Sequence, residues 1–280
     1  MQVVAIIGAG ELGGATAHAL ARSNLVRSIT LVDETRGVAV GKALDIAQAG
    51  PVEGFATQLS GATDVSMAAG ASIVILADRV AGGEWQGDDG LVLLKRLSQT
   101  APGAVILCAG SAQRELIDRG VRELKFARTR LFGSAPESLA AAVRALVALA
   151  VDGSPRDISL SVLGVPPAHT VIPWADATVA GFALTRLVDE PSRRRLSARV
   201  AALWPTGPYV LAAAAATVVE AMTGQSRRVA SCFVAPDFST GTHTRTGAMP
   251  VRLGPAGIVE VVLPSLSAVE QVALDNAMQI

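Results

Sequence analysis

The feature that most constrains this chain is a glycine-rich turn that directly follows an apolar run near the N-terminus. Val3–Ile7 is typical of a buried strand, and Gly8-Ala9-Gly10-Glu11-Leu12-Gly13 leads from it into a helix predicted over Glu11–Arg22. In such a turn the first glycine permits the tight reversal, the second lets the backbone approach a pyrophosphate, and the third lets the helix pack closely on the strand. The helix N-terminus then presents free N–H groups to phosphates. The turn therefore predicts a dinucleotide-binding βαβ unit.

An acidic residue at the end of the second strand strengthens this prediction. Asp33 follows the apolar run Ile29–Val32 and lies 20 positions beyond Gly13. A carboxylate there accepts hydrogen bonds from both adenosine ribose hydroxyls and repels a 2′-phosphate, so it predicts NAD rather than NADP, although Arg36 is close enough to soften that choice. The glycines would serve the turn without any nucleotide, so Asp33 carries more weight. The predicted cofactor site consists of Gly8, Gly10, Glu11, Leu12, Gly13, Asp33, Ala77 and Asp78.

The first half of the chain alternates short apolar runs with helix-like segments. The further predicted strands are Ser72–Leu76, Val105–Leu107 and Arg130–Phe132, and the further predicted helices are Val38–Gln48, Asp88–Gln99 and Gln113–Lys125. Runs that are apolar on both faces are typical of parallel strands covered by helices on both sides. The alternation therefore indicates a doubly wound parallel sheet of the Rossmann type.

The pattern changes after Gly133. An alanine-rich helix is predicted over Glu137–Val151, followed by a strand at Ile158–Leu163 and a hairpin of Ala248–Leu253 with Ile258–Leu263. The remaining predicted helices are Trp174–Val188, Arg194–Leu203, Val210–Met222 and Ser265–Met278, the last of them capped by Ser265. We predict an α/β fold of two parts: a Rossmann-type NAD-binding domain over 1–133 and an α+β substrate-type domain over 134–280.

Composition argues against several classes of partner. The 280 residues carry 24 basic and 24 acidic side chains, so the net charge of zero gives no reason to bind nucleic acid or an anionic membrane. Cys108 and Cys232 lie far apart and form neither a disulfide framework nor a metal-binding spacing. The N-terminus lacks the basic start and cleavage site of a signal peptide. We expect a soluble, cytoplasmic protein without a metal site.

Several longer motifs resemble the malate and lactate dehydrogenase family, nearer its malate branch, and cover nearly the whole chain. They are Gly41-Lys42-Ala43-Leu44-Asp45-Ile46 with Pro51-Val52-Glu53-Gly54-Phe55, Val162-Leu163-Gly164 with Val179-Ala180-Gly181, and Met249-Pro250-Val251-Arg252-Leu253-Gly254 with Gly257-Ile258-Val259-Glu260-Val261-Val262. The resemblance implies reversible hydride transfer between NAD and a 2-hydroxy acid. It also implies a histidine as general acid and base, an aspartate that orients it, arginines that hold the substrate carboxylate, and a homodimer or homotetramer.

The chain departs from this pattern at nearly every one of those positions. Pro166 stands where the resemblance puts the catalytic histidine, and proline has no side-chain group that can move a proton. The orienting aspartate is replaced by Ser138 or Leu139, the clamping arginine by Ala142, two loop arginines by Gly87 and Ala81, and the asparagine after the fourth strand by Gly110. Losing a general base alone costs on the order of 10²–10⁴ in rate. We therefore predict that the chain does not carry out the family reaction on malate or lactate.

Few residues could replace the missing groups. Of the three histidines, His18 lies in the first helix and His243 in a loop rich in threonine and glycine. His169, three positions past Pro166, is the one catalytic candidate, and its ordinary interpretation is a loop histidine.

Three other side chains near the altered site bear on the prediction. Arg79 follows the third strand and is the one arginine near the missing clamps. Arg144 lies two positions past Ala142 on the same helix, so it points about 200° away from the clamp position. Trp85 either closes over a ligand or anchors its loop.

Three interpretations stay open at this point. The chain is a catalytically degenerate member that still binds NAD, an NAD-dependent oxidoreductase with a less anionic substrate, or a structural or partner-binding protein that retains only the fold. The small-molecule ligand is unidentified. A fold does not by itself choose among such functions.

Overall fold

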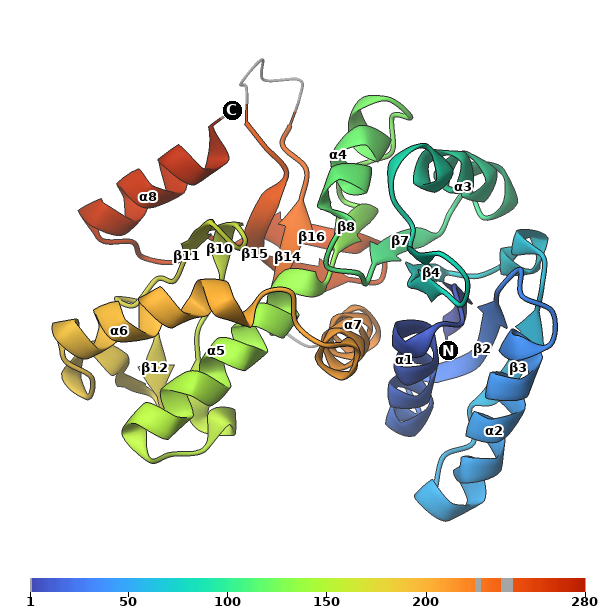
Figure 1. Ribbon diagram of the computed structural model, residues 1–280, viewed down its shortest axis with the longest axis horizontal. Coiled ribbons are helices and arrows are strands. Elements are labelled where there is room, and N and C mark those ends of the chain that lie inside the picture. The colour runs from blue at the N-terminus through green and yellow to red at the C-terminus, as the bar shows by residue number, and fades with distance from the viewer. Residues whose placement is uncertain (1, 225–227, 238–243, 280) are drawn as a thin grey trace.

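The first half of the chain is a parallel sheet with helices on both faces (Figure 1). The computed structural model describes residues 2–224, 228–237 and 244–279. The strands are β1 (Gln2–Ile7), β2 (Val26–Val32), β3 (Gln58–Ala62), β4 (Ile73–Leu76), β7 (Val105–Cys108) and β8 (Leu131–Gly133). They lie in the order β3-β2-β1-β4-β7-β8, and every neighbouring pair is parallel. This order confirms the Rossmann-type fold class.

The helices of this half lie on two sides of the strands. α1 (Glu11–Ser23) and α2 (Val38–Glu53) cover one face, and α3 (Gly87–Thr100) and α4 (Arg114–Arg122) cover the other (Figure 1). Because both faces are covered, β4 and β7 are buried along their whole length and consist only of apolar residues and Cys108. The carboxyl ends of β1, β2, β4 and β7 meet at one edge of the sheet, which is where ligands bind in folds of this kind.

The same sheet continues into the second half with antiparallel pairing. Gly133 of β8 pairs with Phe233 of β14 (Val229–Val234), and β15 (Gly247–Gly254), β10 (Leu163–Val165) and β11 (His169–Val171) follow in that order. β16 (Gly257–Val261) pairs with β15 and closes the predicted hairpin between Gly254 and Gly257. The boundary predicted at residue 133 thus falls where the pairing changes from parallel to antiparallel.

Four helices pack around the second half: α5 (Ala135–Val151), α6 (Glu190–Val200), α7 (Pro208–Thr223) and α8 (Ala268–Met278). α7 returns to the first half and packs between α1 and α5 (Figure 1). Its buried face is mostly alanine and valine, and such short side chains allow close approach of helices. Within the described ranges no single helix is long and apolar enough to cross a bilayer. The segment 190–203 and α7 reach the required length and hydropathy only when taken together, and their axes differ by 101°.

Two predicted elements of this half, a helix and a strand, are wrong. The predicted helix Trp174–Val188 is instead a hairpin of β12 (Thr178–Val179) and β13 (Phe182–Ala183), because Ala180 and Gly181 both adopt positive φ and reverse the chain. The predicted strand Ile158–Leu163 is split between β9 (Ile158–Ser159), which pairs with β12, and the start of β10.

The last helix begins later than predicted. Ser267 rather than Ser265 caps α8, because its side chain accepts the Glu270 N–H while the Glu270 carboxylate accepts the Ser267 N–H. Only a residue three positions before a glutamate or glutamine can form this reciprocal cap, and Ser267 meets that condition.

Candidate functional site

The glycine-rich turn lies at the carboxyl end of β1. Gly8 has a φ of 111°, which glycine adopts without strain, and its N–H donates to Val32 O of β2 at 2.7 Å. A side chain on Gly13 would overlap the Gly8 carbonyl, so α1 can approach β1 this closely only with glycine there. α1 begins at Glu11 without a side-chain cap, while Leu12 is buried against the core. The turn has the geometry that a dinucleotide site requires.

The Asp33 carboxylate faces the same edge of the sheet and is buried. Its Oδ2 accepts the N–H groups of Ala9 at 2.9 Å and Val80 at 3.0 Å, and its Oδ1 accepts the Thr35 N–H at 2.9 Å. Burial on its own would raise the pKa of Asp33, but these three N–H groups together hold the pKa below its usual value. The carboxylate is therefore charged and fixed, with both oxygens already engaged by the protein.

Ala77 and Asp78 follow β4 directly, and the chain then folds back over the glycine turn. Asp78 opens a small hairpin of β5 (Asp78–Arg79) and β6 (Gly83–Glu84). The Asp78 carbonyl accepts the Gly10 N–H at 2.9 Å, and Asp78 Oδ1 accepts the Gly13 N–H at 3.0 Å. A side chain on Gly10 would overlap the Asp78 carboxylate. The carboxylate thus lies where the turn would otherwise receive a phosphate group.

The backbone of the turn and the position of Asp33 suit NAD, but the Asp78 side chain occupies the space that its pyrophosphate would need. The glycine turn and Asp33 are the elements that such a site needs. The space above Gly10 is filled by Asp78, and the Gly13 N–H is already bonded to the same carboxylate. As the side chains lie in this structure, a pyrophosphate has no place over the turn.

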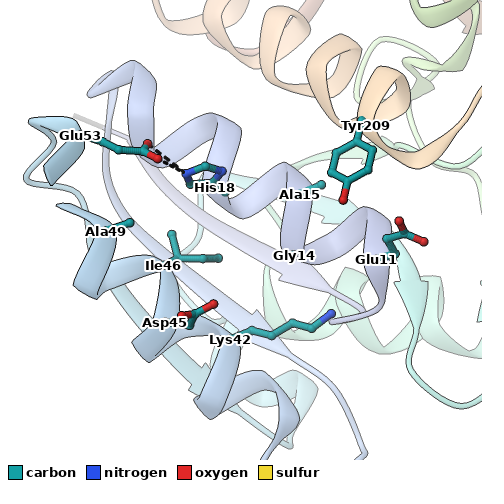
Figure 2. A pocket seen from close by; sticks show the side chains of 10 residues that line it. All are labelled: Glu11, Gly14, Ala15, His18, Lys42, Asp45, Ile46, Ala49, Glu53 and Tyr209. Carbon is teal, nitrogen blue, oxygen red and sulfur yellow. Dashed lines mark hydrogen bonds and ion pairs between the residues drawn. The ribbon is translucent and has the colours of Figure 1, made fainter.

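A pocket of about 450 Å³ lies on the outer side of the turn, between α1 and α2 (Figure 2). Lys42 extends along it and donates to the Gly10 carbonyl at 2.7 Å, while Tyr209 approaches from α7. His18 pairs with Glu53 at 3.0 Å at its far end. Lys42 therefore stabilises the glycine turn through the Gly10 carbonyl. His18 belongs to a surface pair with Glu53, away from the sheet edge where Asp33 lies.

The positions in the second half that would carry a reaction hold side chains without acid–base function. Pro166 is buried between β10 and β11. Ser138 is buried in α5, where its hydroxyl donates to Ala135 O at 2.6 Å and bonds to Thr206 Oγ1 at 2.5 Å. Leu139 is buried in the core and Ala142 is half-buried. None of these groups can accept a proton near neutral pH or bind a carboxylate by a charge-assisted fork.

Comparisons with known proteins agree with the geometry of the first half. A family model described as lactate/malate dehydrogenase, NAD binding domain, matches residues 2–86. Over these residues the chain is similar to the NAD-binding domain of lactate and malate dehydrogenases. The match supports NAD as the cofactor of this part of the chain.

Relatives of this family align over nearly the whole chain. A malate dehydrogenase of Thermomicrobium roseum is 29% identical, with 98% of this chain and 94% of the relative covered. A solved malate dehydrogenase of Salinibacter ruber is similar in fold, with a TM-score of 0.85 at 24% identity over 98% of this chain and 93% of that one. A lactate dehydrogenase of Cryptosporidium parvum, solved with lactic acid and NAD, has a TM-score of 0.87 at 19% identity over 99% and 94% of the two chains. Both halves of the chain are thus similar in fold to these solved dehydrogenases.

The residues that could replace the missing groups of a lactate or malate dehydrogenase are engaged elsewhere or distant. His169 is exposed on β11, at the end of the sheet, and six strands lie between β11 and β1. Arg144 Nη2 donates to Glu137 Oε1 at 2.7 Å. Arg79 stacks over the Trp85 ring at 4.3 Å and pairs with Asp89 at 3.5 Å. His243 lies outside the described residues.

The sequence does not predict the contacts of two further carboxylates, Glu137 and Glu84. Glu137 is buried in α5, where it binds Arg144 and accepts the Ser231 N–H at 2.9 Å. A signal was available, because Glu137 and Arg144 are the only charged residues of α5 and lie about two turns apart, on one face. Glu84 accepts the N–H groups of Ser111 at 3.1 Å and Ala112 at 2.8 Å. No local pattern indicates that contact, because it joins segments 27 and 28 positions apart.

Proposed function

We propose that this chain is an NAD-binding member of the family that does not transfer hydride to or from malate or lactate. The observation that carries the proposal is Pro166, which is buried where the resemblance puts the general base. Without a proton acceptor the oxidation of a hydroxyl is slower by about 10²–10⁴-fold, and without a clamp the carboxylate of a 2-hydroxy acid is not oriented.

The packing around α5 supports this proposal. Arg144, two positions beyond the clamp position Ala142 in the sequence, is held by the buried Glu137 carboxylate. Ser138 points its hydroxyl at the Ala135 carbonyl and Thr206 rather than toward a histidine. A substrate carboxylate would have to outcompete Glu137 for Arg144, and breaking a buried pair of this kind costs about 3–5 kcal/mol. The helix is therefore organised for stability and not for binding an anion.

A direct assay tests the proposal. NADH oxidation is followed at 340 nm with oxaloacetate and with pyruvate, and NADH binding is followed by fluorescence titration of the same preparation. We expect saturable binding together with no turnover above the rate of the buffer. Turnover of either 2-oxo acid would contradict the proposal.

The same experiment separates the two alternatives. Turnover of neutral 2-oxo compounds that is abolished by His169→Ala, but not by His18→Ala, would establish an oxidoreductase with a less anionic substrate. An absence of saturable NADH binding at millimolar concentration would instead favour a structural or partner-binding protein.

Two further proposals concern the whole molecule. We propose a homodimer or homotetramer, because α2 carries exposed Val40, Leu44 and Val52 on a helix that also borders the outer pocket. Light scattering coupled to size-exclusion chromatography measures the mass, and a monomer at micromolar concentration would contradict this. A cytoplasmic location is likewise our proposal, which a fluorescent fusion would test.

A further inference from the structure

The segment from Asp78 to Trp85, here called the crevice segment, crosses the edge of the sheet where β1, β2, β4 and β7 end. In an open doubly wound sheet this crevice is the place where a dinucleotide lies. The crevice segment contacts the glycine turn after β1, the Asp33 carboxylate after β2 and the loop after β7. Its contacts therefore span the crevice from the adenosine side to the nicotinamide side.

Asp78 makes the contact that a phosphate would make. The N-terminus of a helix carries a partial positive charge and free N–H groups, which favour a bound anion. Here the anion is the Asp78 carboxylate, which accepts the Gly13 N–H at 3.0 Å in the first turn of α1 and fills the space above Gly10. A phosphate entering this place would find the Gly13 N–H already bonded to Asp78, and the negative charge of the Asp78 carboxylate would repel it.

Val80 makes the contact that a ribose would make. Its N–H donates to Asp33 Oδ2 at 3.0 Å, and the same oxygen accepts the Ala9 N–H. A carboxylate that binds two ribose hydroxyls needs free lone pairs on both oxygens. Three N–H groups of the chain already donate to Asp33, and two of them use Oδ2, so its carboxylate is not free to bind both ribose hydroxyls.

The other end of the crevice segment is fastened by Glu84 and Trp85. Glu84 accepts the Ser111 and Ala112 N–H groups after β7, and a side chain on Gly110 would overlap its carboxylate. Trp85 is 7% exposed, and its indole N–H donates to Ile7 O, the last residue of β1, at 3.3 Å. A pocket of about 240 Å³ lies beside Arg79 and Trp85, against α3, and is smaller than the roughly 300–1,000 Å³ of ordinary ligand pockets.

We infer that the crevice segment is an internal occupant of the dinucleotide site, so that NAD binds only when Asp78 and Val80 leave the glycine turn and Asp33. The inference rests on the proposed NAD-binding function and adds an autoinhibitory contact to it. It also changes the role of Asp78, which the sequence places among the cofactor ligands. The measured affinity for NAD is then the intrinsic affinity multiplied by the fraction of molecules whose crevice is open.

The first test compares NADH affinity in the full-length wild type, in Asp78→Ala and in Asp78→Asn, which keeps the size of the side chain if the alanine variant does not fold. The exposed Asp176 supplies a matched control, Asp176→Ala. We expect both Asp78 variants to bind NADH about 10-fold more tightly or better, since a hydrogen bond to a charged group is worth more than the 1.4 kcal/mol of a tenfold change. The control should match the wild type. Weaker or unchanged binding by the Asp78 variants would overturn the inference.

The second test is amide hydrogen exchange in the wild type with and without NADH. Displacement predicts that NADH speeds the exchange of the peptide containing residues 78–85, because the Val80 N–H loses Asp33. A loop that closes over its ligand predicts slower exchange, and that result would overturn the inference while leaving the proposed function intact. If no variant binds NADH at millimolar concentration, the proposed function fails and the inference fails with it.

Discussion

Replacing Glu137 with alanine should destabilise the fold by about 3–5 kcal/mol, the usual effect of removing one partner from a buried ion pair. The side chain of Glu137 is 4% exposed and that of Arg144 is 15% exposed. Truncation leaves this guanidinium without its acceptor at 2.7 Å and the buried Ser231 N–H without its acceptor at 2.9 Å. Both groups then carry a desolvation cost.

Urea unfolding followed by circular dichroism measures this loss. The pair of Arg194 and Glu190 is a matched control, because its N–O distance is 2.5 Å but its side chains are 80% and 62% exposed. Glu190→Ala should cost less than about 1 kcal/mol. If Glu137→Ala also costs less than about 1 kcal/mol, then Arg144 is not held by a buried carboxylate and remains free to bind an anionic substrate, which would remove one support of the proposed loss of activity.

Three further outcomes are expected from the structure. The pKa of Asp33 is lower in the folded protein than its value near 3.8 in the unfolded chain, so its charged form stabilises the fold above that pH. This stability is lost as the pH falls through the folded pKa. The stability of Asp33→Asn should therefore depend less on pH in acid unfolding. Burial, with a nearby glutamate, raises the pKa of the Cys108 and Cys232 thiols, so neither should react with a disulfide reagent at pH 8 until the protein is unfolded; rapid labelling of the native protein would contradict this. Ser267→Ala removes the reciprocal cap with Glu270 and should cost about 1 kcal/mol in urea unfolding, whereas the neighbouring Ser265→Ala should cost little.

The sequence predicts most strands of the parallel half because local signals and long-range pairing agree there. The run Ile73–Leu76 is apolar at every position and is also the strand beside β1. β3 was missed because Gln58–Ala62 contains glutamine, serine and glycine, and only its pairing with β2 makes it a strand. Strand propensity reflects packing against neighbours, so a polar edge strand leaves little trace in the sequence.

The candidate site was predictable in its parts but not in its arrangement. The roles of Gly8 and Gly13 follow from spacing alone, and the structure places both as expected. The place of Asp78 does not follow from spacing, because its carboxylate meets a glycine 65 positions away only after the chain has folded back. The reversal needs Gly82 and Gly83, both at positive φ, and a glycine pair indicates a turn without indicating where the turn leads.

The packing of α7 against α1 has a consequence for how the chain is made. α1 ends at Ser23 and α7 begins at Pro208, so the surface of α1 that α7 covers is synthesised long before its partner. At about 5–20 residues per second, a ribosome needs about 10–40 s to add the intervening chain. During that interval the first half can form its parallel strands but leaves one helix uncovered. A nascent chain or a truncated first half would therefore present a surface suited to a chaperone or to aggregation, which the finished molecule hides.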